Sequence, residues 1–144
     1  MIPPYEKSGI LPPGIHVARW EEFSERFCIF QRSTQRIQVG EKLKLLFDEC
    51  QRSGIIKRFV VAGSFVTTKE EPNDFDCIIV LDIAIMKKSI PPFQYNLVSN
   101  KRAKSMFKGD VFPVFEGSQS MNDTIAFFQT TRDGKAMGIV EILL

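Results

Sequence analysis

Residues 55–81 read IIKRFVVAGSFVTTKEEPNDFDCIIVL, a stretch that predicts two strands and the loop between them. It opens on the apolar, β-branched run Ile55–Ala62, which is typical of a β-strand. The second run, Phe75–Leu81, is apolar on both faces after its second residue, which predicts a central strand covered on both sides. The loop Gly63–Asn73 joins the two strands, and we expect one helical turn after Ser64.

Two helices are predicted before this stretch. The first covers about Arg19–Phe30. The second covers about Ser33–Arg52, and Ser53-Gly54 provides its C-terminal stop. The apolar residues of both helices recur at helical spacing and are expected in the core: Trp20, Phe23 and Phe27 in the first, and Ile37, Leu43, Leu46, Phe47 and Cys50 in the second.

A basic segment follows the second strand. Ile83–Gly109 holds six lysines or arginines and no acidic residue, and a helix is predicted over about Gln94–Phe107. Val111–Phe115 is expected to form a strand, and Pro113 places that strand at an edge or a bulge. The remaining predicted elements are a short helix, a turn and a last strand: Asn122–Gln129, Arg132-Asp133-Gly134 and Met137–Leu144.

Helices thus interleave with strands around one sheet, so the predicted fold class is mixed, α/β or α+β. A chain of 144 residues is most simply one domain, spanning 1–144. Residues 1–15 are expected to form an extended arm, because Pro3, Pro4, Pro12 and Pro13 exclude a helix there. This arm is expected to pack either on its own domain or on a partner.

The composition excludes several classes of function. A net charge of +2 is too small for bulk attraction to nucleic acid, and no apolar run or signal peptide points to a membrane. The three cysteines are widely spaced, which is typical of reduced core thiols in a cytoplasmic protein. With His16 as the single histidine, a zinc site or a catalytic triad is not expected, and His16 itself is interpreted as structural or solvated.

The candidate functional residues cluster where the two central strands meet the loop between them. Asp74 and Asp76 are two residues apart, so on a strand their carboxylates project from one face. Such a pair needs a compensating cation or solvent, and Mg²⁺ prefers oxygen ligands of this kind. Gly63 and Ser64 form a turn whose N–H groups can bind phosphate. The Thr67 hydroxyl can donate a further hydrogen bond, and the Lys69 ammonium can reach the phosphate charge. The predicted nucleotide-binding residues are therefore Gly63, Ser64, Thr67 and Lys69. In the simpler interpretation, Asn73-Asp74 is an ordinary turn.

The pattern Gly63-Ser64, nine residues, and Asp74-Phe75-Asp76-Cys77 resembles the nucleotidyltransferase superfamily of DNA polymerase β. A wider resemblance, to a small bacterial family of single-domain nucleotidyltransferase-like proteins, covers nearly the whole chain. It is carried by five segments: Leu11-Pro12-Pro13-Gly14-Ile15-His16 with Trp20 and Phe23, Gly63-Ser64-Phe65-Val66-Thr67, Asp110-Val111-Phe112-Pro113, Phe127-Phe128-Gln129 and Gly138-Ile139-Val140.

The resemblance implies a nucleotidyltransferase-like mixed β-sheet flanked by helices, and a third carboxylate on a later strand. Asp110 is the best candidate, with Glu116 and Glu141 as alternatives. Asp82 is unsuitable, since it lies roughly 20 Å along the strand from Asp76. The implied catalytic and metal-binding set is therefore Asp74, Asp76 and Asp110.

The implied reaction is magnesium-dependent attack of an acceptor oxygen on the α-phosphorus of a nucleoside triphosphate such as ATP. The acceptor is a protein, an RNA or a small molecule, and a protein partner is expected to supply its site, as in toxin–antitoxin pairs. The alternative is a catalytically silent nucleotidyltransferase fold that acts as a binding module. The basic residues Lys101, Arg102 and Lys104 either bind the triphosphate or an acidic acceptor, or form a solvated helix face, and Phe127-Phe128 is interpreted as core.

Overall fold

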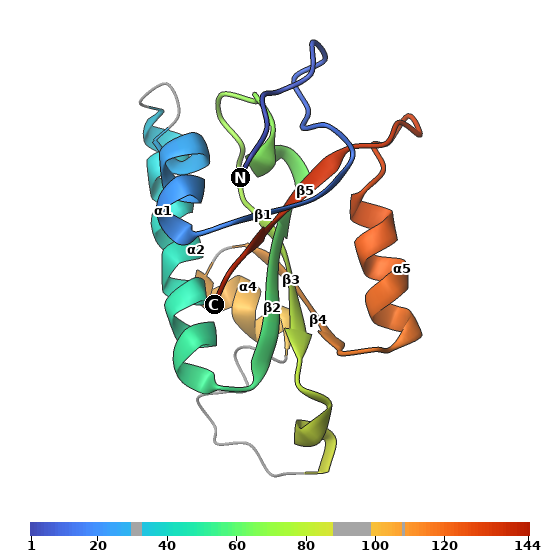
Figure 1. Cartoon of the computed structure of the whole chain (residues 1–144). Coiled ribbons are helices and arrows are strands. Elements are labelled where there is room, and N and C mark those ends of the chain that lie inside the picture. Colours follow the sequence, from blue (N-terminus) through green and yellow to red (C-terminus); the bar gives the residue numbers. More distant parts are fainter. Residues whose placement is uncertain (30–32, 88–98, 108) are drawn as a thin grey trace.

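The computed structural model describes residues 1–29, 33–87, 99–107 and 109–144 (Figure 1). Five strands form one sheet in the order β1-β5-β2-β3-β4. Their bounds are Gly14–Ala18 (β1), Ile56–Ala62 (β2), Asp76–Leu81 (β3), Asp110–Phe115 (β4) and Gly138–Ile142 (β5). The helical elements are α1 (Trp20–Phe23), the π-helical turn η1 (Ser24–Cys28), α2 (Thr34–Ser53), the 3-10 turns η3 (Gly63–Val66) and η4 (Ile83–Lys87), α4 (Asn100–Phe107) and α5 (Gln119–Phe128).

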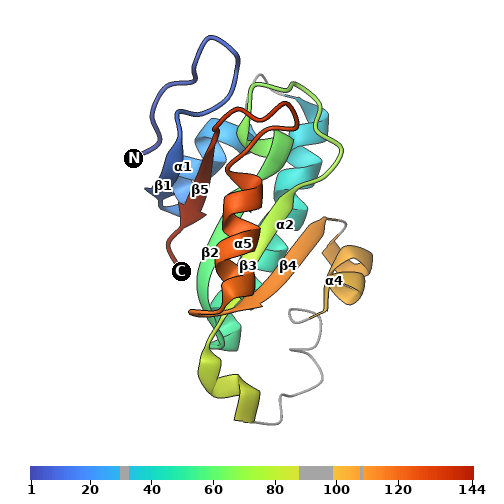
Figure 2. The same ribbon diagram turned by 90° about the vertical axis from the view of Figure 1, so that its right-hand side faces the viewer.

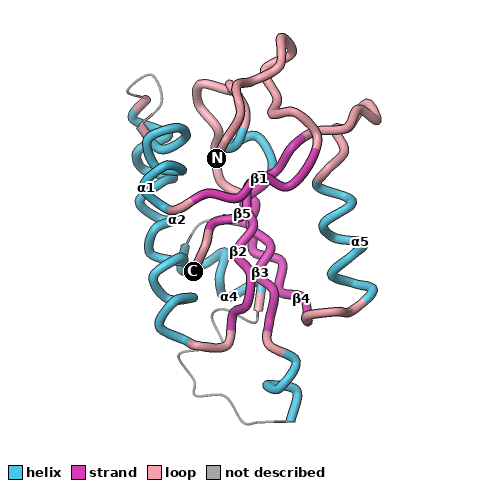
Figure 3. The backbone as a smooth tube through the Cα atoms, in the orientation of Figure 1, coloured by secondary structure: helices cyan, strands magenta, loops and turns pink. Residues whose placement is uncertain are grey.

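The sheet is mixed. Strand β2 is antiparallel to both of its neighbours, β3 and β5, whereas β3 with β4 and β1 with β5 are parallel pairs. The C-terminal end of β2 therefore meets the N-terminal ends of the other four strands at one edge, which is uppermost in Figure 3. The predicted fold class, a mixed α/β sheet flanked by helices, is confirmed.

Helices cover both faces of the sheet. Of the described α-helices, α1, α2 and α4 lie on one face and α5 lies on the other (Figures 1 and 2). The strand residues alternate accordingly, as the period of two requires. Those that face α2 and α4 include Phe59, Val61, Cys77, Ile79 and Val111, and those that face α5 include Val60, Ile78, Val80, Val114 and Ile139. Both sides of β3 are thus buried, as its apolar sequence predicts.

Helix α2 has clear start and stop signals. The Ser33 hydroxyl accepts a hydrogen bond from the Arg36 N–H at 3.2 Å, and Gly54 ends the helix at φ +68°. One expected core position is wrong: Ile37 is 39% exposed, whereas the neighbouring Arg36 is fully buried. The buried stripe of α2 continues from Arg36 through Val39, Leu43, Leu46, Phe47 and Cys50.

The first predicted helix changes its geometry along its length. It begins as α1 and continues as a π-helical turn, and both Phe23 and Phe27 are buried as expected. Its predicted end at Phe30 lies outside the described residues. The same holds for the predicted start at Gln94 of the later helix, of which the structure describes Asn100–Phe107 as α4.

Strand β1 was not expected from the sequence. It continues the proline-rich arm and pairs in parallel with β5, so that β5 lies between the first strand and β2. The arm itself packs on its own domain: Ile2 and Leu11 are buried, and the Arg26 guanidinium donates to the Pro3 carbonyl at 2.8 Å. This decides between the two placements that the sequence left open.

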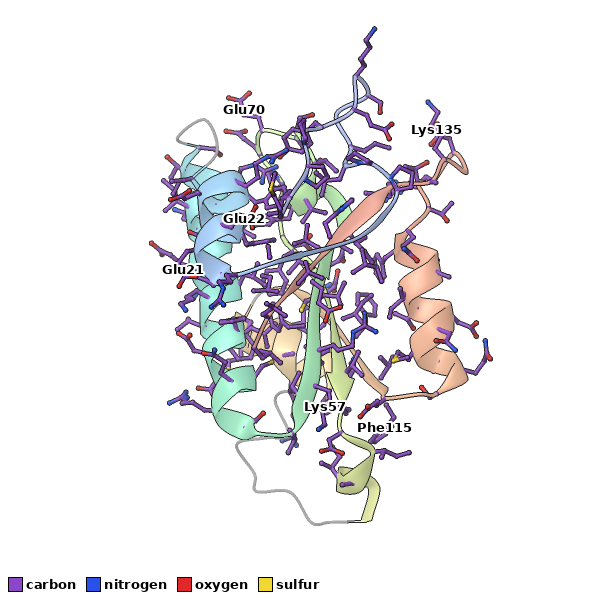
Figure 4. All side chains as sticks on the ribbon, viewed as in Figure 1. Glu21, Glu22, Lys57, Glu70, Phe115 and Lys135 are labelled. Atoms are coloured by element: carbon purple, nitrogen blue, oxygen red, sulfur yellow. The ribbon has the colours of Figure 1, made fainter. Side chains whose placement is uncertain are left out.

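Side chains fill the space between the sheet and its helices (Figure 4). All three cysteines are buried thiols, as predicted, and burial raises the pKa of Cys28 to about 11. The labelled Glu70 and Lys135 project outward at the upper end of the molecule. In the part of the chain that the structure describes, no helix combines the length and apolarity needed to cross a membrane.

Candidate active site

The strand register brings two carboxylates together. Ala62 pairs with Asp76, and Asp76 pairs with Asp110 in the parallel β3–β4 ladder. Residues paired across neighbouring strands lie about 5 Å apart and point to the same face. Because Ile78 and Val114 of the same two strands pack toward α5, the carboxylates at the strand ends face the α5 side of the sheet.

A cavity of about 1040 Å³ opens at this edge of the sheet. All seven predicted site residues line it: Gly63, Ser64, Thr67, Lys69, Asp74, Asp76 and Asp110. One detail of the prediction is wrong, because β3 begins at Asp76 and Asp74 therefore belongs to the preceding loop. Asp74 still reaches the cavity, but from the loop and not by strand alternation.

Gly63 allows the close approach of β2 to the Asp76 carboxylate. It directly follows β2 and adopts φ +77° at the start of η3, a conformation that side chains disfavour. A Cβ atom at this position would overlap Oδ2 of Asp76. The turn therefore requires glycine for two separate reasons, its backbone conformation and the space that the carboxylate occupies.

Gly63→Ala is expected to lower the free energy of unfolding by about 2–3 kcal/mol, since the backbone is strained and the Asp76 carboxylate must move. Gly117→Ala is the matched control, because Gly117 has a similar φ of +74° and open space around its Cβ position. The control should cost about 1 kcal/mol. Urea denaturation measures both variants, and equal losses would show that the contact with Asp76 contributes nothing.

The turn residues after Gly63 play different parts. The Thr67 hydroxyl donates to the Ser64 carbonyl at 2.7 Å and accepts from the Lys69 N–H at 3.2 Å, so it shapes the loop. Within the described ranges the Ser64 hydroxyl has no hydrogen-bond partner and Lys69 forms no ion pair. Ser64 and Lys69 are therefore available to a ligand, whereas the Thr67 proton is already used.

Two carboxylates of the cavity, those of Asp74 and Asp76, have a raised pKa. Burial raises the pKa of Asp76 to about 6, and the charges of Asp74 and Asp110 add to this, while Lys104 opposes it. The pKa of Asp74 is also raised, first by burial and then by Asp110, against the opposing charges of Lys104 and Lys69. Concentrated negative charge of this kind favours a cation in the cavity.

Asp110 already has a cationic partner. The Lys104 ammonium of α4 lies 2.9 Å from its Oδ1, and Lys104 is 60% exposed. Lys104 is one of the three basic residues, with Lys101 and Arg102, for which triphosphate binding is one of the two predictions. In the structure its ammonium contacts a carboxylate. Among the residues placed by the structure, no three acidic, histidine or cysteine side chains converge closely enough to hold a metal as they stand. A shared ion would require Asp74, Asp76 and Asp110 to draw together.

The other acidic residues considered for the third carboxylate have different partners or lie at the other end of the sheet. Glu141 accepts hydrogen bonds from the Arg58 guanidinium at 3.0 and 2.7 Å. Asp82 lies 3.6 Å from the Lys57 ammonium, at the far end of β3 from Asp76. Glu116 follows the C-terminal end of β4, opposite to the end that carries Asp110. Asp110 is therefore the carboxylate on a later strand that lies beside Asp76.

Sequence reasoning missed Arg36, which holds the loop in place. Its guanidinium is fully buried and donates to four backbone carbonyls at 2.5–3.0 Å: those of Phe27, Phe65, Thr67 and Lys69. Three of these carbonyls belong to the loop that lines the cavity. The Gly9 carbonyl adds a further restraint by accepting from the Thr68 N–H at 2.9 Å. The sequence signal for the burial of Arg36 is its position: it lies one helical turn before Val39 and two before Leu43, on the buried face of α2.

The apolar side of the cavity was also missed. Phe112, Phe127 and Phe128 line it together with Ile10 and Met137, and Arg132 lies at the same opening. The interpretation of Phe127 as core is wrong, because its side chain is 71% exposed. Phe127 follows the buried Ile125 of α5 by two residues, and this spacing is the signal that it lies outside the buried face of the helix.

Comparison with protein families matches this chain over nearly its whole length. The model of the family of unknown function DUF6932 matches residues 3–143. No curated protein and no solved structure matches the chain. Because the match covers almost the whole chain, the protein belongs to the family DUF6932.

Proposed function

We propose that this chain is a minimal, magnesium-dependent nucleotidyltransferase that moves a nucleoside monophosphate from a nucleoside triphosphate to an acceptor. One observation carries the proposal: the Gly63-Ser64 turn and the carboxylates of Asp74, Asp76 and Asp110 line one cavity. The type of reaction is inferred from the sequence resemblance to nucleotidyltransferases. The register of β3 and β4 supports it, since Asp110 lies beside Asp76.

Magnesium suits the donor set, which consists of carboxylate oxygens only. Asp76 and Asp74 would hold the ion, and Asp110 would complete the set once its ion pair with Lys104 opens. When bound, the ion supplies positive charge to the phosphate oxygens and lowers the pKa of an attacking hydroxyl. The raised pKa of Asp76 supports this assignment, because an added cation relieves the repulsion that causes part of it.

The other residues position the substrate. The N–H groups of the Gly63–Val66 turn bind the phosphates, and the ammonium of Lys69 neutralises part of their charge. The Ser64 hydroxyl donates a further hydrogen bond. The Asp110 carboxylate accepts the proton of the acceptor hydroxyl as that oxygen attacks the α-phosphorus in line, with pyrophosphate leaving.

The acceptor is a protein, an RNA or a small molecule. A partner protein would present it, in the manner of toxin–antitoxin pairs. We propose a cytoplasmic location, which the three buried free thiols support because they fit a reducing compartment.

A second candidate is a catalytically silent binding module. The ion pair between Lys104 and Asp110 favours it, because a lysine then neutralises the carboxylate that the reaction needs as a base. Such a module would bind a nucleoside triphosphate with magnesium and turn over none of the acceptors offered.

Calorimetry with magnesium and each of ATP, GTP, CTP and UTP tests the proposal. We expect binding to require magnesium and to weaken by at least about a hundredfold in the double variant Asp74→Asn/Asp76→Asn. Asp82→Asn is the control, since Asp82 lies at the other end of β3, paired with Lys57. Magnesium-dependent binding that survives in the double variant would overturn the proposed site, and binding without turnover would support the silent module.

A further inference from the structure

Three phenylalanines form a continuous wall on the α5 side of the cavity. Phe112 of β4 contacts Phe128 of α5 with ring centroids 5.1 Å apart. Phe128 in turn meets Phe127 at 5.1 Å and an angle of 89°. We call Phe112, Phe127 and Phe128 the aromatic wall. It borders the cavity of about 1040 Å³ and a smaller hollow of about 270 Å³ beside it.

The wall is anchored at one end and open at the other. Phe112 and Phe128 are partly buried and pack against the core beneath α5. Phe127 is the most exposed aromatic side chain among the residues of the core and cavity, at 71%. Exposing apolar surface costs about 25 cal/mol per Å², and polar residues are more usual at such a helix position. An exposed ring held by a partly buried one is suited to contact a ligand.

The charges around the cavity indicate the kind of ligand. The carboxylates of Asp74, Asp76 and Asp110 lie at one side, with the aromatic wall also lining the cavity. Two cations, Lys69 and Arg132, line the same space and form no ion pair within the described part of the chain. A matching ligand carries a planar apolar ring and a group of negative charges that arrive with a metal ion. The cavity volume of about 1040 Å³ lies just above the upper end of the range typical of small-molecule pockets, about 300–1,000 Å³.

We propose that the aromatic wall stacks the nucleobase of the triphosphate, with Phe127 as the exposed contact. This inference rests on the proposed function and adds to it where the base lies. Stacking on an aromatic face is tolerant of base identity, because every base has a π-face. The wall therefore gives affinity for nucleotides as a class, with little preference among the four bases.

Comparing ATP and CTP with inorganic tripolyphosphate, each with magnesium, isolates the contribution of the base. Calorimetry on the wild type should give about tenfold or tighter binding for both nucleotides than for tripolyphosphate. Phe127→Ala should remove this advantage and leave tripolyphosphate binding unchanged, and Phe127→Trp should preserve it. Leu45→Ala is the matched control, since Leu45 is an exposed apolar residue of α2, 52% exposed and outside the cavity. Phe127 is exposed, so its variants are expected to fold.

The outcomes separate this inference from the proposed function. Equal affinity of the wild type for ATP, CTP and tripolyphosphate would overturn the stacking role and leave the metal–phosphate site standing. Nucleotide preference that survives in Phe127→Ala would overturn it as well. If tripolyphosphate does not bind but adenosine binds in a Phe127-dependent manner, the aromatic wall is supported and the proposed function is overturned. If neither nucleotide nor adenosine binds, both fail.

Discussion

Asp76→Asn is expected to stabilise the folded chain at pH 7 while it abolishes magnesium-dependent nucleotide binding. Asp76 is ionised at this pH although its pKa of about 6 lies above the ordinary value of 3.8, so the folded state holds an unfavourable charge. If the whole difference between the two pKa values were converted into free energy of unfolding, it would amount to roughly 3 kcal/mol. Partial access to solvent reduces it, and we expect a gain of about 1–2 kcal/mol in the free energy of unfolding.

The pH dependence identifies the cause. A carboxylate with a raised pKa in the folded state favours folding when it is protonated, and this contribution is lost as the pH rises through about 6. The advantage of Asp76→Asn should therefore be complete above pH 6, shrink between pH 6 and 3.8, and vanish below. Urea titrations at several pH values measure it. A variant that is less stable than the wild type at pH 7 would contradict the expectation. Asp82→Asn, which loses the charge that pairs with Lys57, should show no gain.

Arg36→Met is expected to lower the free energy of unfolding by about 3–5 kcal/mol, because buried backbone carbonyls lose their donors. Methionine replaces most of the packing volume but none of the five guanidinium hydrogen bonds to Phe27, Phe65, Thr67 and Lys69. Three of those carbonyls belong to the loop around the cavity, so nucleotide binding should weaken together with stability. Urea denaturation and calorimetry measure the two effects.

Arg52→Met is the matched control in the same helix. Arg52 is 70% exposed and, among the described residues, pairs with Glu49 alone, so its loss should change stability by less than about 0.5 kcal/mol. Arg36→Lys should recover part of the loss at most, because an ammonium cannot span carbonyls that a planar guanidinium fork reaches. A loss of under 1 kcal/mol in Arg36→Met would mean that the loop keeps its conformation without this residue.

The position of the site could be predicted because its signals are local. The turn at Gly63, the acidic residues at Asp74 and Asp76, and the apolar run that follows are all adjacent in the sequence. Asp110 is different, since its place beside Asp76 depends on the parallel register of β3 and β4. The resemblance to nucleotidyltransferases pointed to it, and periodicity alone would not have distinguished it from Glu116 or Glu141.

The missed features depend on contacts between distant segments. Arg36 is charged, and charged residues are normally exposed, so the helical stripe suggested the neighbouring Ile37 instead. Its burial becomes reasonable only once carbonyls from the later loop surround it. Phe127 was assigned to the core because aromatic residues usually are buried. Strand β1 is five residues long and follows two prolines, and it forms because β5 offers it an edge.

The position of β5 between β1 and β2 has a consequence for biosynthesis. Gly14 pairs with Gly138, so β1 leaves the ribosome on the order of ten seconds before its partner β5 at typical elongation rates. Until then β2 has an unpaired edge, and the arm lacks the hydrogen bond that the Gly138 N–H donates to its Leu11 carbonyl. Nascent chains should therefore depend on chaperones during this interval, and the site should mature only after translation has passed Ile142.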